Sequence, residues 1–145
     1  MAKKKTSHEQ ESLDLARQCV WAAQEKKAHD PIILDLRGIS TITDYLVICS
    51  GQSEPQLKAI ANGVEQALKE KPGRHPLAVD GFPTSQWIVM DYGDVMFHIF
   101  HEAKRPVYAL EDLWSDAPQV STKLGSPAHR VRRLPFLLFC GRHSR

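Results

Sequence analysis

The stretch that decides the fold is Gln86-Trp87-Ile88-Val89-Met90-Asp91-Tyr92-Gly93-Asp94-Val95-Met96-Phe97-His98-Ile99-Phe100. Two apolar runs flank the short connection Tyr92-Gly93, a pattern typical of a β-hairpin. With Tyr92-Gly93 as a two-residue loop, Trp87 lies opposite His98. In the same register Val89 lies opposite Met96. A one-residue bulge at the glycine would change these pairs.

The two faces of this hairpin differ in composition, because side chains alternate across a strand. The first set is uniformly apolar and is expected to lie under helices: Ile88, Met90, Val95, Phe97 and Ile99. The second set is mixed: Trp87, Met96, His98 and Phe100, with Asp91 and Asp94 at the tip. Aromatic residues and Met are enriched at interface centres, which favours a protein-binding surface. The alternative is that Trp87 and Met96 pack under the closing helix or the tail.

The residues before the hairpin predict two helices and two strands. Glu9 to Lys27 carries apolar residues at helical spacing, with Ser7 or Ser12 as its N-cap. Residues 32–36 and 45–49 are expected to be strands, the second apolar enough to be central and covered on both faces. A second helix is expected from the cap Ser53 to about residue 71.

The remaining segments complete an α/β domain. Residues 76–79 predict a weak strand, and Pro106 to Trp114 predict one short closing helix. Its expected anchors are Tyr108, Leu110, Leu113 and Trp114. The order αββαβββα indicates a mixed sheet of about five strands with flanking helices. From Ser115 onward the Pro, Gly and Ser content favours a linker.

Charge is distributed unevenly along the chain. Residues 1–120 hold 13 Lys/Arg and 17 acids, net −4, whereas residues 121–145 hold six Lys/Arg and no acid. We therefore expect a basic flexible N-terminus at 1–8, a domain at 9–118 and a basic, disordered tail at 119–145. An acidic domain is a poor general binder of nucleic acid but suits a basic protein partner.

Cysteine usage and hydropathy indicate the compartment. The three cysteines are odd in number and widely spaced, which disfavours a disulfide framework and fits a reducing cytoplasm. No apolar run approaches the roughly 18 residues that span a bilayer. The N-terminus lacks the apolar region of a secretory signal. We expect a cytoplasmic protein.

Catalytic patterns are weak. A nucleotidyltransferase-like site needs a Gly-Ser turn, which Ser50-Gly51 resembles, and an Asp-x-Asp pair for metal ions. Here the sequence is Asp35-Leu36-Arg37, so that an arginine stands at the position of the second acid, and its positive charge would repel Mg²⁺. A zinc site of His75, His98 and His101 is disfavoured, because the last two point to opposite faces of one strand. No phosphate-binding loop is present in the sequence. We predict a non-enzyme without cofactor or metal.

Four blocks, in unbroken order across roughly residues 9–118, resemble the ribosomal silencing factor family, also called Iojap or RsfS. The blocks are Asp35–Ser53, Val79-Asp80-Gly81, Trp87–Phe100 and Tyr108–Trp114. Within the first block, we interpret Ser40, Asp44, Gly51 and Ser53 as turn and cap residues.

The resemblance implies a fold related to nucleotidyltransferases but without their catalytic carboxylates. It further implies binding to the large ribosomal subunit through ribosomal protein fourteen. Such binding would block subunit association and repress translation under nutrient limitation. The resemblance places the partner-binding surface on Trp87, His98, Phe100 and Tyr108, with Met96 and Asp91 as neighbours.

Several alternatives stay open on the sequence alone. One alternative function is that of a large-subunit assembly factor. Another is that of a nucleotide-binding enzyme of nucleotidyltransferase-like fold. The basic tail would contact ribosomal RNA, or it would have no role. A face carrying Trp87, Met96 and Phe100 would also support a homodimer when the protein is free.

Overall fold

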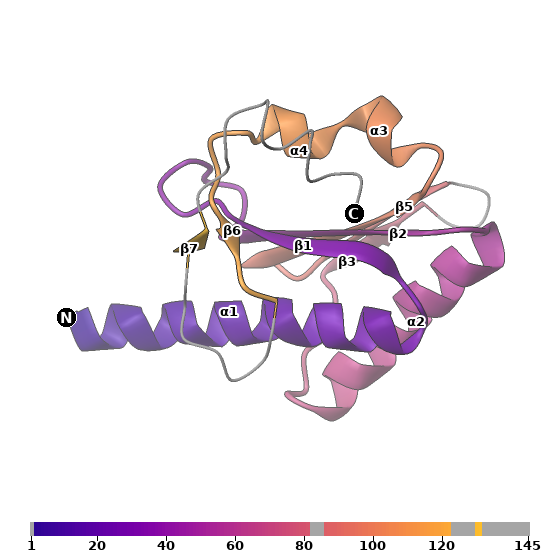
Figure 1. Ribbon diagram of the computed structural model, residues 1–145. Helices are drawn as coiled ribbons and strands as arrows, with labels where there is room; N and C mark the ends of the chain where they lie inside the picture. The colour runs from indigo at the N-terminus through magenta and orange to yellow at the C-terminus, as the bar shows by residue number, and fades with distance from the viewer. Residues whose placement is uncertain (1, 82–85, 123–129, 132–145) are drawn as a thin grey trace.

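The computed structural model of the chain describes residues 2–81, 86–122 and 130–131. Its elements are α1 (Ala2–Glu25), β1 (His29–Asp35), β2 (Tyr45–Gly51), α2 (Glu54–Glu70), β3 (Ala78–Asp80), β4 (Trp87–Asp91), β5 (Val95–His101), α3 (Arg105–Tyr108), α4 (Leu110–Leu113), β6 (Gln119–Val120) and β7 (Arg130–Val131). One mixed sheet has the strand order β3-β4-β5-β2-β1-β6-β7. Helices α1 and α2 lie on one side of it, and α3 and α4 on the other (Figure 1). The predicted α/β class is confirmed.

Strand β2 lies at the centre of the sheet, as its apolar run predicted. It pairs in parallel with β5 and antiparallel with β1. All seven of its residues are buried. Alternate side chains enter two separate hydrophobic clusters: Val47 joins the one under α1 and α2, and Ile48 the one under α3 and α4. Both faces of β2 are covered for this reason.

The hairpin register differs from the predicted one by two residues. Trp87 pairs with Phe100 rather than with His98, and Val89 pairs with His98 rather than with Met96. The chain turns one residue later than expected, at Gly93-Asp94, where Gly93 has a φ of 92° that disfavours other residues. Because the shift is even, every side chain on the two strands keeps its predicted face.

The apolar face of the hairpin lies under α1 and α2, as expected. Its five members are fully or almost fully buried in the larger cluster: Ile88, Met90, Val95, Phe97 and Ile99. Helix α2 starts as predicted, since the Ser53 side chain accepts a hydrogen bond from the Gln56 backbone N–H at 3.2 Å. Pro55 occupies its first turn, where a missing N–H is tolerated.

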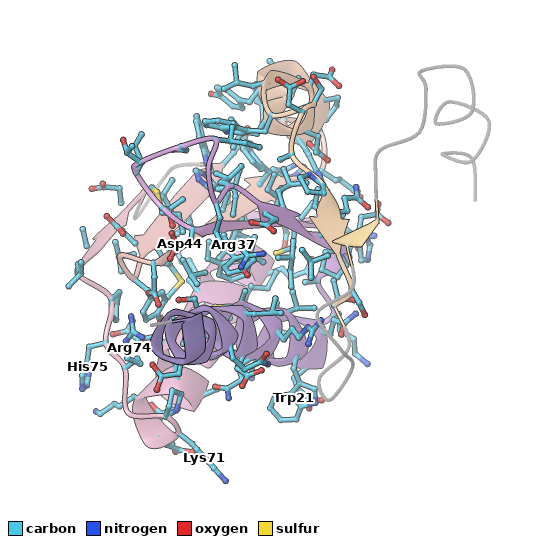
Figure 2. All side chains as sticks on the ribbon, turned by 90° about the vertical axis from the view of Figure 1, so that its left-hand side faces the viewer. Trp21, Arg37, Asp44, Lys71, Arg74 and His75 are labelled. Carbon is cyan, nitrogen blue, oxygen red and sulfur yellow. The ribbon has the colours of Figure 1, made fainter. Side chains whose placement is uncertain are left out.

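Helix α1 begins at Ala2, earlier than expected, so Ser12 lies inside it and is not its cap. The Ser12 hydroxyl instead donates to a carboxylate oxygen of Asp94 at 2.8 Å. The other oxygen of Asp94 accepts from Arg74 at 2.8 Å. Figure 2 looks along α1 and shows Arg74 beside it. The hairpin turn is thus tied to α1 and to the loop that follows α2, and Asp94 does not extend the mixed face.

The closing helix is two short helices rather than one. Ala109 between α3 and α4 has a φ of 48°, in the left-handed region, which interrupts the helical path. Of the four predicted anchors, Leu110 and Trp114 pack against the smaller cluster. Leu113 is 70% exposed instead, and Tyr108 is 47% exposed although its ring contacts Trp87 and Phe100.

Residues expected to form a linker include further strands. Gln119–Val120 pairs with β1, and Arg130–Val131 pairs with β6. The boundaries of the predicted segments 1–8, 9–118 and 119–145 stay a prediction. The apolar tail residues 134–139 lie outside the described residues. In the part of the chain that the structure describes, no helix has the length and hydropathy to cross a bilayer.

Other predicted turn residues have structural contacts. The Ser40 side chain accepts a hydrogen bond from the Ile42 N–H at 3.1 Å. The Asp44 N–H donates to the Asp94 carbonyl at 3.0 Å, which joins the β1–β2 loop to the hairpin turn. Gly51 is the last residue of β2 rather than a turn residue, and a Cβ there would lie 3.0 Å from the Leu57 side chain, which is a tight contact. These contacts support the structural interpretation.

Candidate protein-binding surface

Four aromatic rings from three elements meet on the mixed face of the sheet. We call this group the ring cluster; it comprises Trp87 of β4, His98 and Phe100 of β5, and Tyr108 of α3. The Trp87 ring centroid lies 4.4 Å from that of Tyr108, 4.9 Å from that of Phe100 and 5.8 Å from that of His98. Phe100 and Tyr108 are also stacked, at 5.6 Å. The structure therefore brings together the four residues that the sequence singled out.

Accessibility increases across the cluster from its floor to its outer ring. Phe100 is completely buried and His98 is 8% exposed, whereas Trp87 is partly buried and Tyr108 is 47% exposed. Phe100 therefore supports the other rings from below. Tyr108 presents most of the surface that another molecule would meet.

Trp87 and His98 are joined by a hydrogen bond. The indole Nε1–H donates to His98 Nδ1 at 2.9 Å. An imidazole that accepts at Nδ1 carries its proton on Nε2 and is neutral. Burial lowers the pKa of His98 from 6.5 to about 4, which keeps the ring neutral near pH 7.

Exposed apolar side chains flank Tyr108 on the same two short helices. Val107 is 68% exposed on α3, and Leu113 is 70% exposed on α4. Sequence reasoning missed Val107 and assigned Leu113 to the core, because it assumed one continuous helix. Asp112 and Asp116 are exposed on this segment as well. Exposed Lys104 precedes α3, so the surface around Tyr108 is apolar with charged neighbours of both signs.

Arg105 holds the two short helices against the sheet. Its guanidinium contacts the Glu111 carboxylate at 2.8 and 2.9 Å. It also donates to the Ser50 hydroxyl at 3.1 Å, at the end of β2. The arginine thus links α3 to α4 and to the central strand, and it sets where Tyr108 lies.

Met96 and Asp91, the two predicted neighbours, lie on the face of the ring cluster and pair with each other across the strands. Met96 is partly buried and packs against the smaller hydrophobic cluster. The Asp91 carboxylate accepts from the Gly93 N–H at 2.8 Å and so stabilises the hairpin turn. A partner-binding role for either residue stays a prediction.

The candidate catalytic groups are engaged in structural contacts. Both carboxylate oxygens of Asp35 accept hydrogen bonds from the Arg37 guanidinium, at 2.9 and 2.7 Å. Figure 2 shows Arg37 near Asp44 at the end of the sheet. The His101 imidazole accepts from the Ala103 N–H at 3.1 Å. Across residues 2–81, 86–122 and 130–131, no three His, Cys, Asp or Glu side chains are grouped to hold a metal ion.

The chain is similar to known proteins over most of its length. Residues 9–134 match the family described as "Ribosomal silencing factor during starvation". The ribosomal silencing factor RsfS of Halalkalibacterium halodurans is 41% identical over 111 residues, which are 77% of this chain and 92% of that protein. The corresponding protein of Bacillus subtilis is 39% identical over 104 residues, 72% of this chain and 87% of that protein. A crystal structure of a Chromobacterium violaceum protein superimposes with a TM-score of 0.66 at 31% identity, covering 69% of this chain and 82% of that one.

Proposed function

This chain belongs to the ribosomal silencing factor family, and from this premise we propose that it binds the large ribosomal subunit through ribosomal protein fourteen. Bound there, it would block subunit association sterically and repress translation under nutrient limitation. The matched family is named for ribosomal silencing during starvation, which supports a repressive effect on translation when nutrients are limiting.

The observation that carries the proposal is the ring cluster with its exposed apolar surroundings. Tyr108 is supported from below by Trp87 and Phe100, so it offers a large apolar area whose position is already set. Rigid aromatic residues of this kind dominate binding energies at protein interfaces. Val107 on α3 and Leu113 on α4 are exposed apolar side chains of the same segment.

Binding alone is sufficient for the proposed mechanism. The domain without the Lys3–Lys5 run carries a net charge of −7 up to residue 120, from ten Lys/Arg and 17 acids. Attraction to a basic ribosomal protein would raise the association rate and make it sensitive to salt. We propose no catalytic step, and the engagement of Asp35 by Arg37 supports this.

Sedimentation of purified ribosomal subunits in sucrose gradients tests the proposal. With the protein added, we expect fewer joined ribosomes and the protein in the large-subunit fractions. An unchanged amount of joined ribosomes despite comigration would favour an assembly role instead. Absence from the large-subunit fractions would contradict binding, and capture by isolated ribosomal protein fourteen tests the named partner.

A matched pair of variants assigns the surface. Tyr108→Ala removes the exposed ring of the cluster, whereas Trp21→Ala removes a 54% exposed aromatic from α1, on the opposite side of the sheet. Figure 2 shows Trp21 pointing outward from that helix. Only Tyr108→Ala should release the protein from large subunits. Equal binding by both variants would contradict this face as the binding surface.

Three further expectations remain proposals. The protein would act in the cytoplasm, where ribosomal subunits join. The basic tail, with six Lys/Arg among residues 121–145, would contact ribosomal RNA beside the binding site. The free protein would form a homodimer through the ring cluster, which analytical ultracentrifugation across a concentration series would detect.

A further inference from the structure

The only side-chain hydrogen-bond donor of Trp87, its indole N–H, is used in a hydrogen bond within the protein. An indole has one N–H and no acceptor, and here that N–H donates to His98 Nδ1 at 2.9 Å. The same ring is stacked on Phe100 at 4.9 Å and contacts Tyr108 at 4.4 Å. The hydrogen bond sets the rotation of the indole, and the two rings confine its faces.

His98 is poorly placed to meet a partner directly. It is 8% exposed and lies in β5 between two paired strands, opposite Val89 of β4 and Ile48 of β2. Its Nδ1 accepts the indole proton, and its ring lies 6.2 Å from Phe100 at an interplanar angle of 12°. The direct effect of this side chain is therefore on Trp87.

We propose that His98 is a positioning residue for the binding surface: it holds the Trp87 indole with its N–H inward, so that the partner meets only ring carbon. This inference rests on the proposed function. It specifies the partner chemistry, because a surface of ring carbon that offers no donor suits an aliphatic side chain and not a hydrogen-bond acceptor.

Two substitutions at His98 separate positioning from packing. His98→Leu keeps most of the volume and removes the acceptor, whereas His98→Asn places a carbonyl oxygen near the position of Nδ1. We expect His98→Leu to bind isolated large subunits about tenfold more weakly, the loss typical of one hydrogen bond that fixes an anchor. His98→Asn should bind within about threefold of the unmodified protein. Ile88→Val, buried on the opposite face, is the control for lost stability alone.

The indole N–H resonances report the positioning directly. The chain has three tryptophans, whose ¹⁵N-indole signals are assigned by single Trp→Phe changes. The Trp87 signal should exchange slowly with solvent in the unmodified protein and in His98→Asn, but rapidly in His98→Leu. This measurement needs no ribosome, so it stands even if the proposed function fails.

Clear results overturn the inference. Rapid exchange in His98→Leu with unchanged binding would show that indole orientation is irrelevant to the partner. Equal losses for His98→Leu and His98→Asn would show that the imidazole acts in some other way. If His98→Leu does not fold, His98→Phe replaces it: an aromatic ring remains, the acceptor is lost, and binding should again fall about tenfold.

Discussion

Arg105 and Glu111 form an ion pair, with Nη2 of the arginine 2.8 Å from Oε2 of the glutamate, that joins α3 to α4 across the left-handed residue Ala109. The two side chains are only 11% and 23% exposed. A pair this sheltered from water keeps more of its attraction than a surface pair does. It determines where the segment bearing Tyr108 lies on the sheet.

Arg105→Gln should therefore affect stability and binding together. The substitution removes the Arg105 charge from Glu111 and weakens the link to Ser50. We expect a loss of about 2 kcal/mol in the free energy of unfolding, measured by urea denaturation. Binding to large subunits should weaken as the α3–α4 segment loosens. Full stability in Arg105→Gln would show that packing of Leu110 and Trp114 is sufficient to hold the segment.

Tyr108→Ala should weaken binding with little cost in stability. The ring is 47% exposed, so truncation creates no closed cavity. If Tyr108 is an anchor, its loss should cost about 2 kcal/mol in binding free energy, measured by titration with fluorescently labelled protein. A change in affinity below about twofold, well under the loss expected of an anchor, would remove Tyr108 from the binding surface.

Stability should depend on pH through His98. Burial lowers the pKa of this imidazole to about 4 in the folded protein, against 6.5 ordinarily. Between these values the unfolded chain binds the extra proton, so stability falls as pH drops from about 6.5 to about 4. The loss is at most about 3 kcal/mol. Urea denaturation of His98→Leu against the unmodified protein should show a flatter profile in this interval.

Asp94 should contribute to stability in a lower pH interval. Burial alone would raise the pKa of its carboxyl, but hydrogen bonds from Arg74 and Ser12 and the charge of Arg74 bring the net pKa below the usual 3.8. This stabilisation is complete above the usual pKa of 3.8, and it is lost as the pH falls through the lowered pKa. Asp94→Asn should lose about 1–2 kcal/mol at pH 7 and show a weaker dependence below pH 4. An unchanged unfolding midpoint would contradict a stabilising tie of the turn to Ser12 and Arg74.

Much of the candidate site follows from the two-residue alternation of side chains along the hairpin strands. Alternation alone places Trp87, His98 and Phe100 on one face, and the structure keeps them there although the register is shifted by two residues. The register itself could not be predicted, because two adjacent residue pairs, Tyr92-Gly93 and Gly93-Asp94, both offer a short turn. Pairing of Tyr92 with Val95, through a 2.9 Å hydrogen bond, favours the second.

The amino-acid sequence by itself determined the class of fold, the central strand, the cap at Ser53 and the composition of both hairpin faces, since each depends on neighbours within a few positions. Which side chains of the mixed face are accessible depends on contacts between segments that are distant in the chain. Phe100 is buried and Tyr108 exposed because α3 and α4 are held by Arg105 against strands that precede them by more than fifty residues. Contacts across such separations, like that of Ser12 with Asp94, form only when the sheet brings the segments together.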